Sequence, residues 1–275
     1  MPRGMPRRDL LAALAALPVA SCAGGPGADI WRRHDPLSTR VVDHRVWQVL
    51  LDRNTRDWPD GITRVDYARF STADRELLEA YVREQSALPV ASLSRVEQLA
   101  FWLNLYNALV VRLVLDHLIV GSPDEIQTGG LFSRGPWDVP LVRVEGREVS
   151  LAGIRREVLA PVFRDPRWHY GLCDGTLGAP SLGRQAFVGA DVDRRLEDAA
   201  IEYIAHPRAV DLPADRPGIL RLNSLWRRHM DDFGGSLQAV FASIDLYAEA
   251  ELRAVLARDP QVVWMDDRRL NAFQV

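Results

Sequence analysis

The feature that most constrains this chain is an apolar stretch over residues 94–118, SRVEQLAFWLNLYNALVVRLVLDHL. Ser94 followed three residues later by Glu97 predicts a capping box at the start of a helix. From Val96 onward, apolar residues would lie on nearly every side of that helix, which is typical of a helix inside a protein core. We therefore expect a buried central helix around which the rest of the chain packs.

One stripe of this predicted helix is polar. At 3.6 residues per turn, Glu97, Asn104 and Asn107 fall on the same face. A buried polar group without a hydrogen-bond partner costs about 1–3 kcal/mol. The stripe therefore faces either a polar site or backbone groups of neighbouring loops, which the two asparagines would hold in place. Buried polar clusters are more often structural than catalytic, which favours the second interpretation.

The N-terminus has the features of an export signal. Residues 1–8 are basic, residues 10–20 form an apolar run far shorter than the roughly 20 residues that span a bilayer, and Val-Ala-Ser-Cys follows at 19–22. This order predicts a signal peptide over 1–21. It resembles a twin-arginine leader with a bacterial lipobox, which implies lipidation of Cys22, a membrane anchor through that lipid and a position facing the periplasm. Residues 22–35 would then be a tether.

The remaining pattern predicts one domain over residues 36–275. Helical periodicity is expected at 36–51, 72–85, 151–159, 191–204, 225–233, 236–244 and 246–257. Extended segments are expected at 65–70, 168–173, 219–222 and 261–265, with a hairpin formed by 141–144 and 147–151. The predicted fold class is α+β, a helix-rich single domain with a buried central helix and a small, mostly antiparallel sheet.

Composition excludes several classes of function. With 47 % hydrophobic and 26 % charged residues among 275, the chain has an ordinary globular composition. All 34 basic residues are arginine, and they are scattered without interleaved aromatic residues, so we expect no nucleic-acid partner. The sequence contains no HExxH, CxxC, GxGxxG or P-loop pattern, so neither a metal nor another cofactor is predicted.

The best candidate for chemistry is the segment from Trp168 onward, where a predicted strand is followed by a Gly/Pro-rich loop. Along an extended strand His169 and Cys173 would be roughly 13 Å apart, too far to act as nucleophile and base together. A Cys173 nucleophile would need a base from elsewhere. His169 would need Glu97, an asparagine of the central helix, or Asp174 brought to it by the loop. The alternatives are that His169 is a core histidine with satisfied hydrogen bonds and that Cys173 is a small buried hydrophobe.

The stretch FWLNLYNA at 101–108 resembles the signature of a bacterial and plant family catalogued as domain of unknown function 547. Glu97, Asn104, Tyr106, Asn107 and His169 match that family's pattern. The order of the other pieces also fits, from about residue 58 to 271. The family carries no established activity that could be transferred.

Two departures from the family pattern affect the expected site. Arg155 and Arg156 stand where the family usually has Glu-His, and Asp174 stands where it usually has Cys. The resemblance therefore implies a divergent member. Arginines at these positions would suit an anionic ligand, because a guanidinium can hold a carboxylate or phosphate through two hydrogen bonds.

These observations leave two functions open. The favoured hypothesis is a non-catalytic module that binds an unknown small-molecule or protein ligand, with Asn104, Tyr106, Asn107, Arg155 and Arg156 as candidate binding residues. The alternative is a cell-envelope hydrolase or transferase of papain- or transglutaminase-like type. It would use His169 with Cys173 or Asp174, and Glu97 as a further candidate. The missing family residues favour the binding module.

Overall fold

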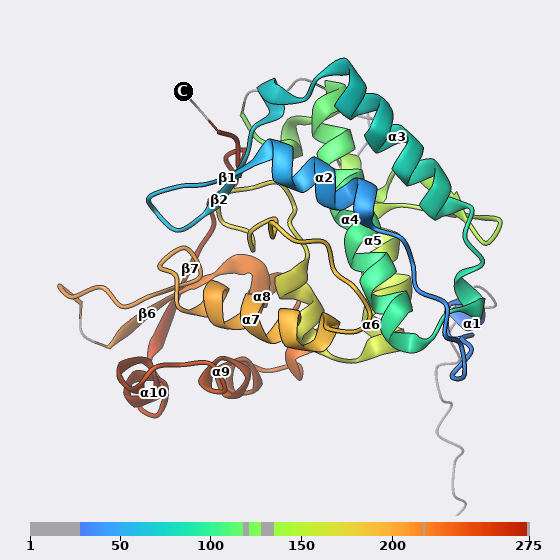
Figure 1. Ribbon diagram of the computed structural model, residues 1–275. Helices are drawn as coiled ribbons and strands as arrows, with labels where there is room; N and C mark the ends of the chain where they lie inside the picture. Colours follow the sequence, from blue (N-terminus) through green and yellow to red (C-terminus); the bar gives the residue numbers. More distant parts are fainter. Residues whose placement is uncertain (1–27, 118–120, 128–134, 217, 274–275) are drawn as a thin grey trace, which may run out of the picture.

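The computed structural model describes residues 28–117, 121–127, 135–216 and 218–273 (Figure 1). The N-terminal half contains α1 (Ala28–Trp31), α2 (Arg45–Asn54), β1 (Thr55–Asp57), β2 (Thr63–Val65), α3 (Thr72–Ser86), α4 (Arg95–His117), β3 (Val142–Val144) and β4 (Arg147–Val149). The second half of the chain contains α5 (Leu151–Gly153), α6 (Ala160–Phe163), α7 (Val192–Ile204), β5 (Val210–Asp211), β6 (Ile219–Asn223), α8 (Ser224–Arg228), α9 (Leu237–Asp245), α10 (Ala250–Leu256) and β7 (Gln261–Met265). Six short 3₁₀ helices and one π-helix lie between these elements in the described residues: η1 (Tyr67–Arg69), η2 (Val90–Ser92), η3 (Pro123–Glu125), η4 (Pro136–Asp138), the π-helix η5 (Ile154–Leu159), η6 (Pro166–Gly171) and η7 (Met230–Phe233).

The central helix is confirmed as α4, and it is buried along most of its length. In Figure 1 it runs behind α2, with α3 packed beside it. Its length and apolar composition would also suit a membrane span, but most of its surface is covered by the protein itself. Burial on nearly every side is what its continuous apolar character predicts, so α4 is a core helix and gives no indication of a membrane anchor.

The strands form small sheets, as the α+β prediction requires. β1 pairs with β2, β3 with β4, and β5 with β6, all antiparallel, whereas β6 and β7 run parallel. The hairpin turn between β3 and β4 places Glu145 and Gly146 at positive φ, as a tight two-residue turn needs. The helix-rich α+β class is therefore confirmed, with one parallel pair added.

Two adjoining hydrophobic clusters make up the core. The larger one surrounds α4 and includes Trp47, Trp102 and Trp168. The smaller one lies between α7, β6, α8, α9 and α10 and includes Tyr170 and Trp226. Trp168 and Tyr170 are two residues apart on η6, so this short helix lies where the two clusters meet. The segment around η6 therefore packs against both clusters.

The polar stripe of α4 holds three neighbouring segments by their backbone. Glu97 Oε2 accepts a hydrogen bond of 3.0 Å from the Val42 amide, so the predicted capping box with Ser94 is wrong. The carboxylate is close to Gly189, where any side chain would collide with it. Asn104 donates to the Phe187 carbonyl at 2.7 Å and accepts from its amide at 2.9 Å.

Asn107 plays the same part further along the helix. It donates to the Gly171 carbonyl at 2.9 Å and accepts from the Cys173 amide at 2.9 Å. Both asparagines thus donate to and accept from backbone groups of neighbouring segments. These hydrogen bonds support the interpretation that the polar stripe is structural.

The strand predicted for residues 168–173 is wrong, because residues 166–171 form η6, a 3₁₀ helix. Asp165 caps it by accepting from the Arg167 amide, and Pro166 fixes φ at its first position. These local signals outweigh the apolar alternation of the segment. Similarly, the helix predicted for 36–51 begins only at Arg45, and the extended segment predicted for 65–70 contains the turn η1.

The packed part of the chain begins before the predicted domain boundary at residue 36. Trp31 of α1 is buried and meets Trp102 edge-on at a ring-centroid distance of 5.3 Å. The predicted signal peptide, the lipobox and Cys22 lie outside the described residues. They remain predictions from the sequence.

Replacing Asn107 by Ala should destabilise the fold. The Gly171 carbonyl and the Cys173 amide would both lose their partner inside the core, at a cost of about 2–5 kcal/mol in the free energy of unfolding. Urea unfolding followed by circular dichroism measures the change. Asp116→Ala, at an exposed position in the last turn of α4, is the control and should stay within about 0.5 kcal/mol of wild type. Equal stability of the two variants would contradict this role.

Candidate binding site

A cavity of about 340 Å³ opens beside the C-terminal half of α4. Its walls come from α4, η4, the helical segment 151–163 and the turn between α8 and η7. The lining residues are Tyr106, Trp137, Ala152, Arg155, Arg156, Ala160, His229 and Asp232. Three residues of the predicted binding set, Tyr106, Arg155 and Arg156, therefore share one cavity.

Arg155 projects from an irregular stretch of helix. Residues Ile154–Leu159 are π-helical, and the Ala160 amide bonds to the Arg155 carbonyl five residues back. Pro161 follows and has no amide hydrogen, so the ordinary i to i−4 ladder cannot continue there. Insertions of this type often occur at functional sites.

His169 is held by two charged groups, one on each ring nitrogen. Its Nε2 lies 2.9 Å from Asp232 Oδ2, and its Nδ1 lies 3.3 Å from Arg155 Nη2. Because a guanidinium can only donate, Nδ1 must be the acceptor, and the ring proton lies on Nε2 and is donated to Asp232. His169 is therefore a neutral imidazole with a defined tautomer, placed between a guanidinium and a carboxylate.

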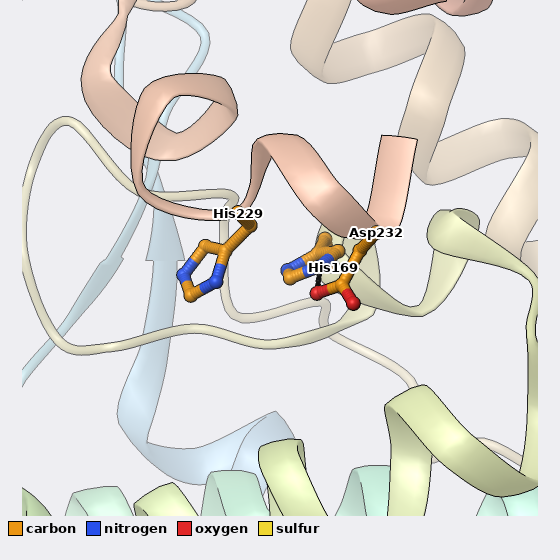
Figure 2. Close-up of side chains that lie close together, drawn as sticks. All are labelled: His169, His229 and Asp232. Carbon is orange, nitrogen blue, oxygen red and sulfur yellow. Dashed lines mark hydrogen bonds and ion pairs between the residues drawn. The ribbon is translucent and has the colours of Figure 1, made fainter. Parts of the chain in front are cut away.

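His229 accepts from the same guanidinium. Arg155 Nη2 lies 2.5 Å from His229 Nε2, and the two imidazole centroids are 4.5 Å apart. Figure 2 shows His229 and Asp232 projecting from one turn of the chain toward His169, which comes from a separate segment. His229 and Asp232 are three residues apart in the sequence, which places both side chains on the same side of that turn.

The pKa values of this cluster follow from burial and from the Arg155 charge. Burial, assisted by Arg155, holds the pKa of His169 well below its usual range. Burial, Arg155 and His169 lower the pKa of His229 to about 2. Burial raises the pKa of Asp232, against the attraction of His229 and Arg155. Both imidazoles are thus neutral at physiological pH.

The same three side chains are the group that could hold a metal ion within the described part of the chain. The ligand atoms of His169, His229 and Asp232 lie within 4.8 Å of one another. However, the guanidinium of Arg155 already donates to both imidazoles. A cation supplied by the protein therefore occupies one ring nitrogen of each histidine, Nδ1 of His169 and Nε2 of His229.

Arg155 itself lacks an anionic partner. Among the described residues it forms no ion pair, and its Nε is buried without a hydrogen bond. The Tyr106 hydroxyl is also buried without a hydrogen-bond partner in the same part of the structure. Burial raises the pKa of Tyr106 to about 12, although the nearby Arg155 charge acts in the opposite direction. Tyr106 is therefore a neutral donor next to an uncompensated guanidinium.

Arg156 is in a different situation. It is 68 % exposed at the edge of the cavity and forms an ion pair with Asp138. Its charge is already balanced, so of the two arginines predicted to bind an anion it is Arg155 that has an unbalanced charge.

The structure does not bring the other catalytic candidates to His169. Glu97 accepts from the Val42 amide, and Cys173 is buried in the core, where its backbone amide donates to Asn107. Asp174 accepts from Thr176 and forms an ion pair of 2.7 Å with Arg268, which helps to keep the pKa of Asp174 low despite burial. No hydrogen bond among the described residues links any of the three to His169.

Sequence reasoning missed His229 and Asp232 as site residues. The available signal was a histidine and an aspartate three residues apart at a predicted helix end, a spacing that places both on one face. Nothing in the sequence pairs that turn with His169, which is 60 residues away.

Cys173 should be unreactive in the native protein. Burial raises the pKa of its thiol to about 12, so little thiolate exists at neutral pH, and alkylating reagents cannot reach it. Iodoacetamide treatment followed by peptide mass spectrometry should find Cys173 unlabelled in native protein and labelled after denaturation. Rapid labelling of the native protein would contradict this assignment and revive a thiol mechanism.

Stability should fall as the pH drops below about 6.5. His44, like His169 and His229, has a pKa lowered by burial, in its case to about 4. In the unfolded chain these histidines take up protons near pH 6.5, whereas the native protein cannot. Each should reduce the free energy of unfolding by about 1.4 kcal/mol per pH unit below that point.

Urea unfolding at pH 7.5, 6.0 and 5.0 measures this slope. His229→Asn should decrease it by about one third, because one of the three proton uptakes is removed. A wild-type protein equally stable at all three pH values would show that the buried histidines are already charged.

Comparison with known families finds a match over part of the chain. Residues 90–204 match the model of the family described as protein of unknown function, DUF547. No curated protein and no solved structure matches the chain. The matched region includes Tyr106, Arg155 and His169 but ends before His229 and Asp232, so the cavity is completed by residues beyond it. Over residues 90–204, the chain is similar to the DUF547 family.

Proposed function

We propose that this protein is a non-catalytic binding protein of the cell envelope that holds a small organic anion in the cavity beside Arg155. The observation that carries this proposal is a partly buried guanidinium without an anionic partner among the described residues, in the wall of a cavity large enough for a ligand.

The electrostatics favour an anionic occupant. Removing a charge from water is costly unless an opposite charge or several hydrogen bonds compensate for it. Arg155 donates to two neutral imidazoles, and neither of them balances its charge. A carboxylate or phosphate in the cavity would supply that balance through charge-assisted hydrogen bonds, and the Tyr106 hydroxyl offers a further donor nearby.

The size and walls of the cavity also suit a small ligand. About 340 Å³ is at the lower end of the range of small-molecule sites, roughly 300–1,000 Å³. Trp137, Ala152 and Ala160 supply apolar wall, and three of the eight lining residues are charged. This combination is typical of pockets in which polar groups orient a ligand that is otherwise held by apolar contact.

Binding is favoured over catalysis because both nitrogens of His169 are engaged. A general base needs a free lone pair directed at the substrate, but Nδ1 accepts from Arg155 and Nε2 carries the proton donated to Asp232. The thiol of Cys173 is buried with its pKa raised to about 12, and the carboxylate of Asp174 forms an ion pair with Arg268. A hydrolase or transferase mechanism would require Arg155 to leave its present position first.

The proposed location rests on the N-terminal sequence. A signal peptide followed by a lipobox at Cys22 would place the protein outside the cytoplasm, attached to a membrane by its lipid. Such an anchor would suit a protein that captures small solutes in the cell envelope.

Replacing Arg155 by Met should weaken anion binding. Isothermal titration of the full chain with carboxylates of increasing size and with inorganic phosphate should find at least one ligand for wild type. The Arg155→Met variant should bind that ligand about tenfold or more weakly, because a charge-assisted hydrogen bond is lost.

Arg156→Met is the matched control at the edge of the cavity. Its charge is already paired with Asp138, so the affinity should change by less than about threefold. Arg155→Lys keeps a charge at the site and should retain part of the affinity. Equal anion affinity in wild type and a folded Arg155→Met variant would overturn the proposal.

A further inference from the structure

We infer that the ligand of this cavity is a zwitterion of the α-amino-acid type, with its carboxylate at Arg155, its ammonium group at Asp232 and an apolar side chain. This inference deepens the proposed anion binding and rests on it. It comes from a second charge in the wall of the cavity, opposite in sign to that of Arg155 and without an arginine ion-pair partner among the described residues.

Asp232 is that second charge. It lines the cavity, and 27 % of its side chain is exposed. Its Oδ2 accepts a hydrogen bond from the protonated Nε2 of His169, which leaves Oδ1 to accept a hydrogen bond from a ligand. Since His169 receives a hydrogen bond from Arg155 on its other nitrogen, the imidazole is neutral and does not balance the carboxylate. Among the described residues Asp232 has no arginine partner.

Arg155 and Asp232 are kept apart by the ring between them. They bond to opposite nitrogens of His169, at 3.3 Å and 2.9 Å, and form no ion pair with each other within the described structure. The histidine therefore acts as a spacer that holds a positive and a negative group at a fixed separation along one wall. An α-amino acid carries an ammonium and a carboxylate group on one carbon, and in this inference it bridges the two partners across the face of the imidazole.

The pair of charges also disfavours simpler ligands. An anion with no positive group would place its charge close to the Asp232 carboxylate, and an amine with no carboxylate would face Arg155. A zwitterion leaves neither protein charge unpaired and adds no net charge to a partly buried site. Discrimination of this kind comes from repulsion of the wrong ligand as much as from attraction of the right one.

The remaining wall defines the rest of the molecule. Trp137, Ala152 and Ala160 offer an apolar surface to a side chain. A volume of about 340 Å³ accommodates a single amino acid or a compound of similar size rather than an extended peptide.

Matched pairs of probes test the inference on the wild-type protein. Each pair consists of an amino acid and the same molecule without its amino group: alanine and propionate, leucine and 4-methylpentanoate, phenylalanine and 3-phenylpropanoate. Isothermal titration of the full chain should find at least one amino acid that binds about tenfold or more tightly than its partner, because the ammonium group adds a charge-assisted hydrogen bond to Asp232. The amide of the best amino acid, which lacks the carboxylate, should bind as weakly.

A variant then assigns the preference to Asp232. Asp232→Asn has the same shape and still offers an oxygen to His169 Nε2, but it has no charge. It should lower the affinity for the amino acid to about that for its carboxylate partner. Asp231→Asn, at the exposed neighbouring position, should leave both affinities unchanged. Thermal unfolding of each variant verifies that it is folded.

The outcomes separate this inference from the proposed function. If the carboxylates bind as tightly as their amino acids, the zwitterion inference is wrong and the anion proposal stands. If neither the amino acids, the carboxylates nor inorganic phosphate binds wild type, both are wrong. If Asp232→Asn does not fold, the comparison of matched probes on wild type decides the question alone.

Discussion

The architecture depends on how α4 satisfies polar groups inside the core. A helix buried on nearly every side leaves little room for water, so the loops packed against it need hydrogen-bond partners from protein. Asn104 and Asn107 supply them, each with one donor and one acceptor to backbone. Asn107 holds the backbone at Gly171 and Cys173, directly after η6. The position of His169 on η6, and with it the candidate site, therefore depends on a side chain that does not itself line the cavity.

The site is organised around a cation that belongs to the protein. Arg155 donates to His169 and His229 and fixes the tautomer of His169, while burial together with the Arg155 charge keeps both imidazoles neutral. That tautomer in turn orients the carboxylate of Asp232 through a 2.9 Å hydrogen bond. The result is a guanidinium, an imidazole and a carboxylate in series beside a cavity. Such a series resembles the orienting half of a catalytic triad, but no nucleophile adjoins it among the described residues, and the nitrogen that would act as base faces a positive charge.

The elements predicted correctly from sequence are those with a strong local pattern. The apolar run of α4, the amphipathic periodicity of α3 and the Glu145-Gly146 turn each specify their structure within a few residues. The failures have equally local causes. Around His169, a cap at Asp165 and the fixed φ of Pro166 produced a 3₁₀ helix where alternating apolar residues predicted a strand. Ser94 and Glu97 have the spacing of a capping box, but the Glu97 carboxylate accepts a hydrogen bond from the Val42 amide instead.

The sequence by itself determined that the chain has a buried central helix, that its polar stripe must find partners, and that it resembles the DUF547 family through the FWLNLYNA stretch. Periodicity and composition carry this information because they act over neighbouring residues. Only the tertiary structure decided which residues form the site. Tyr106, Arg155, His169 and Asp232 come from four separate segments, and their meeting depends on how the two hydrophobic clusters pack. It also decided that Arg155 lacks an opposite charge while Arg156 has one in Asp138, because adjacent residues on a helix point into different surroundings.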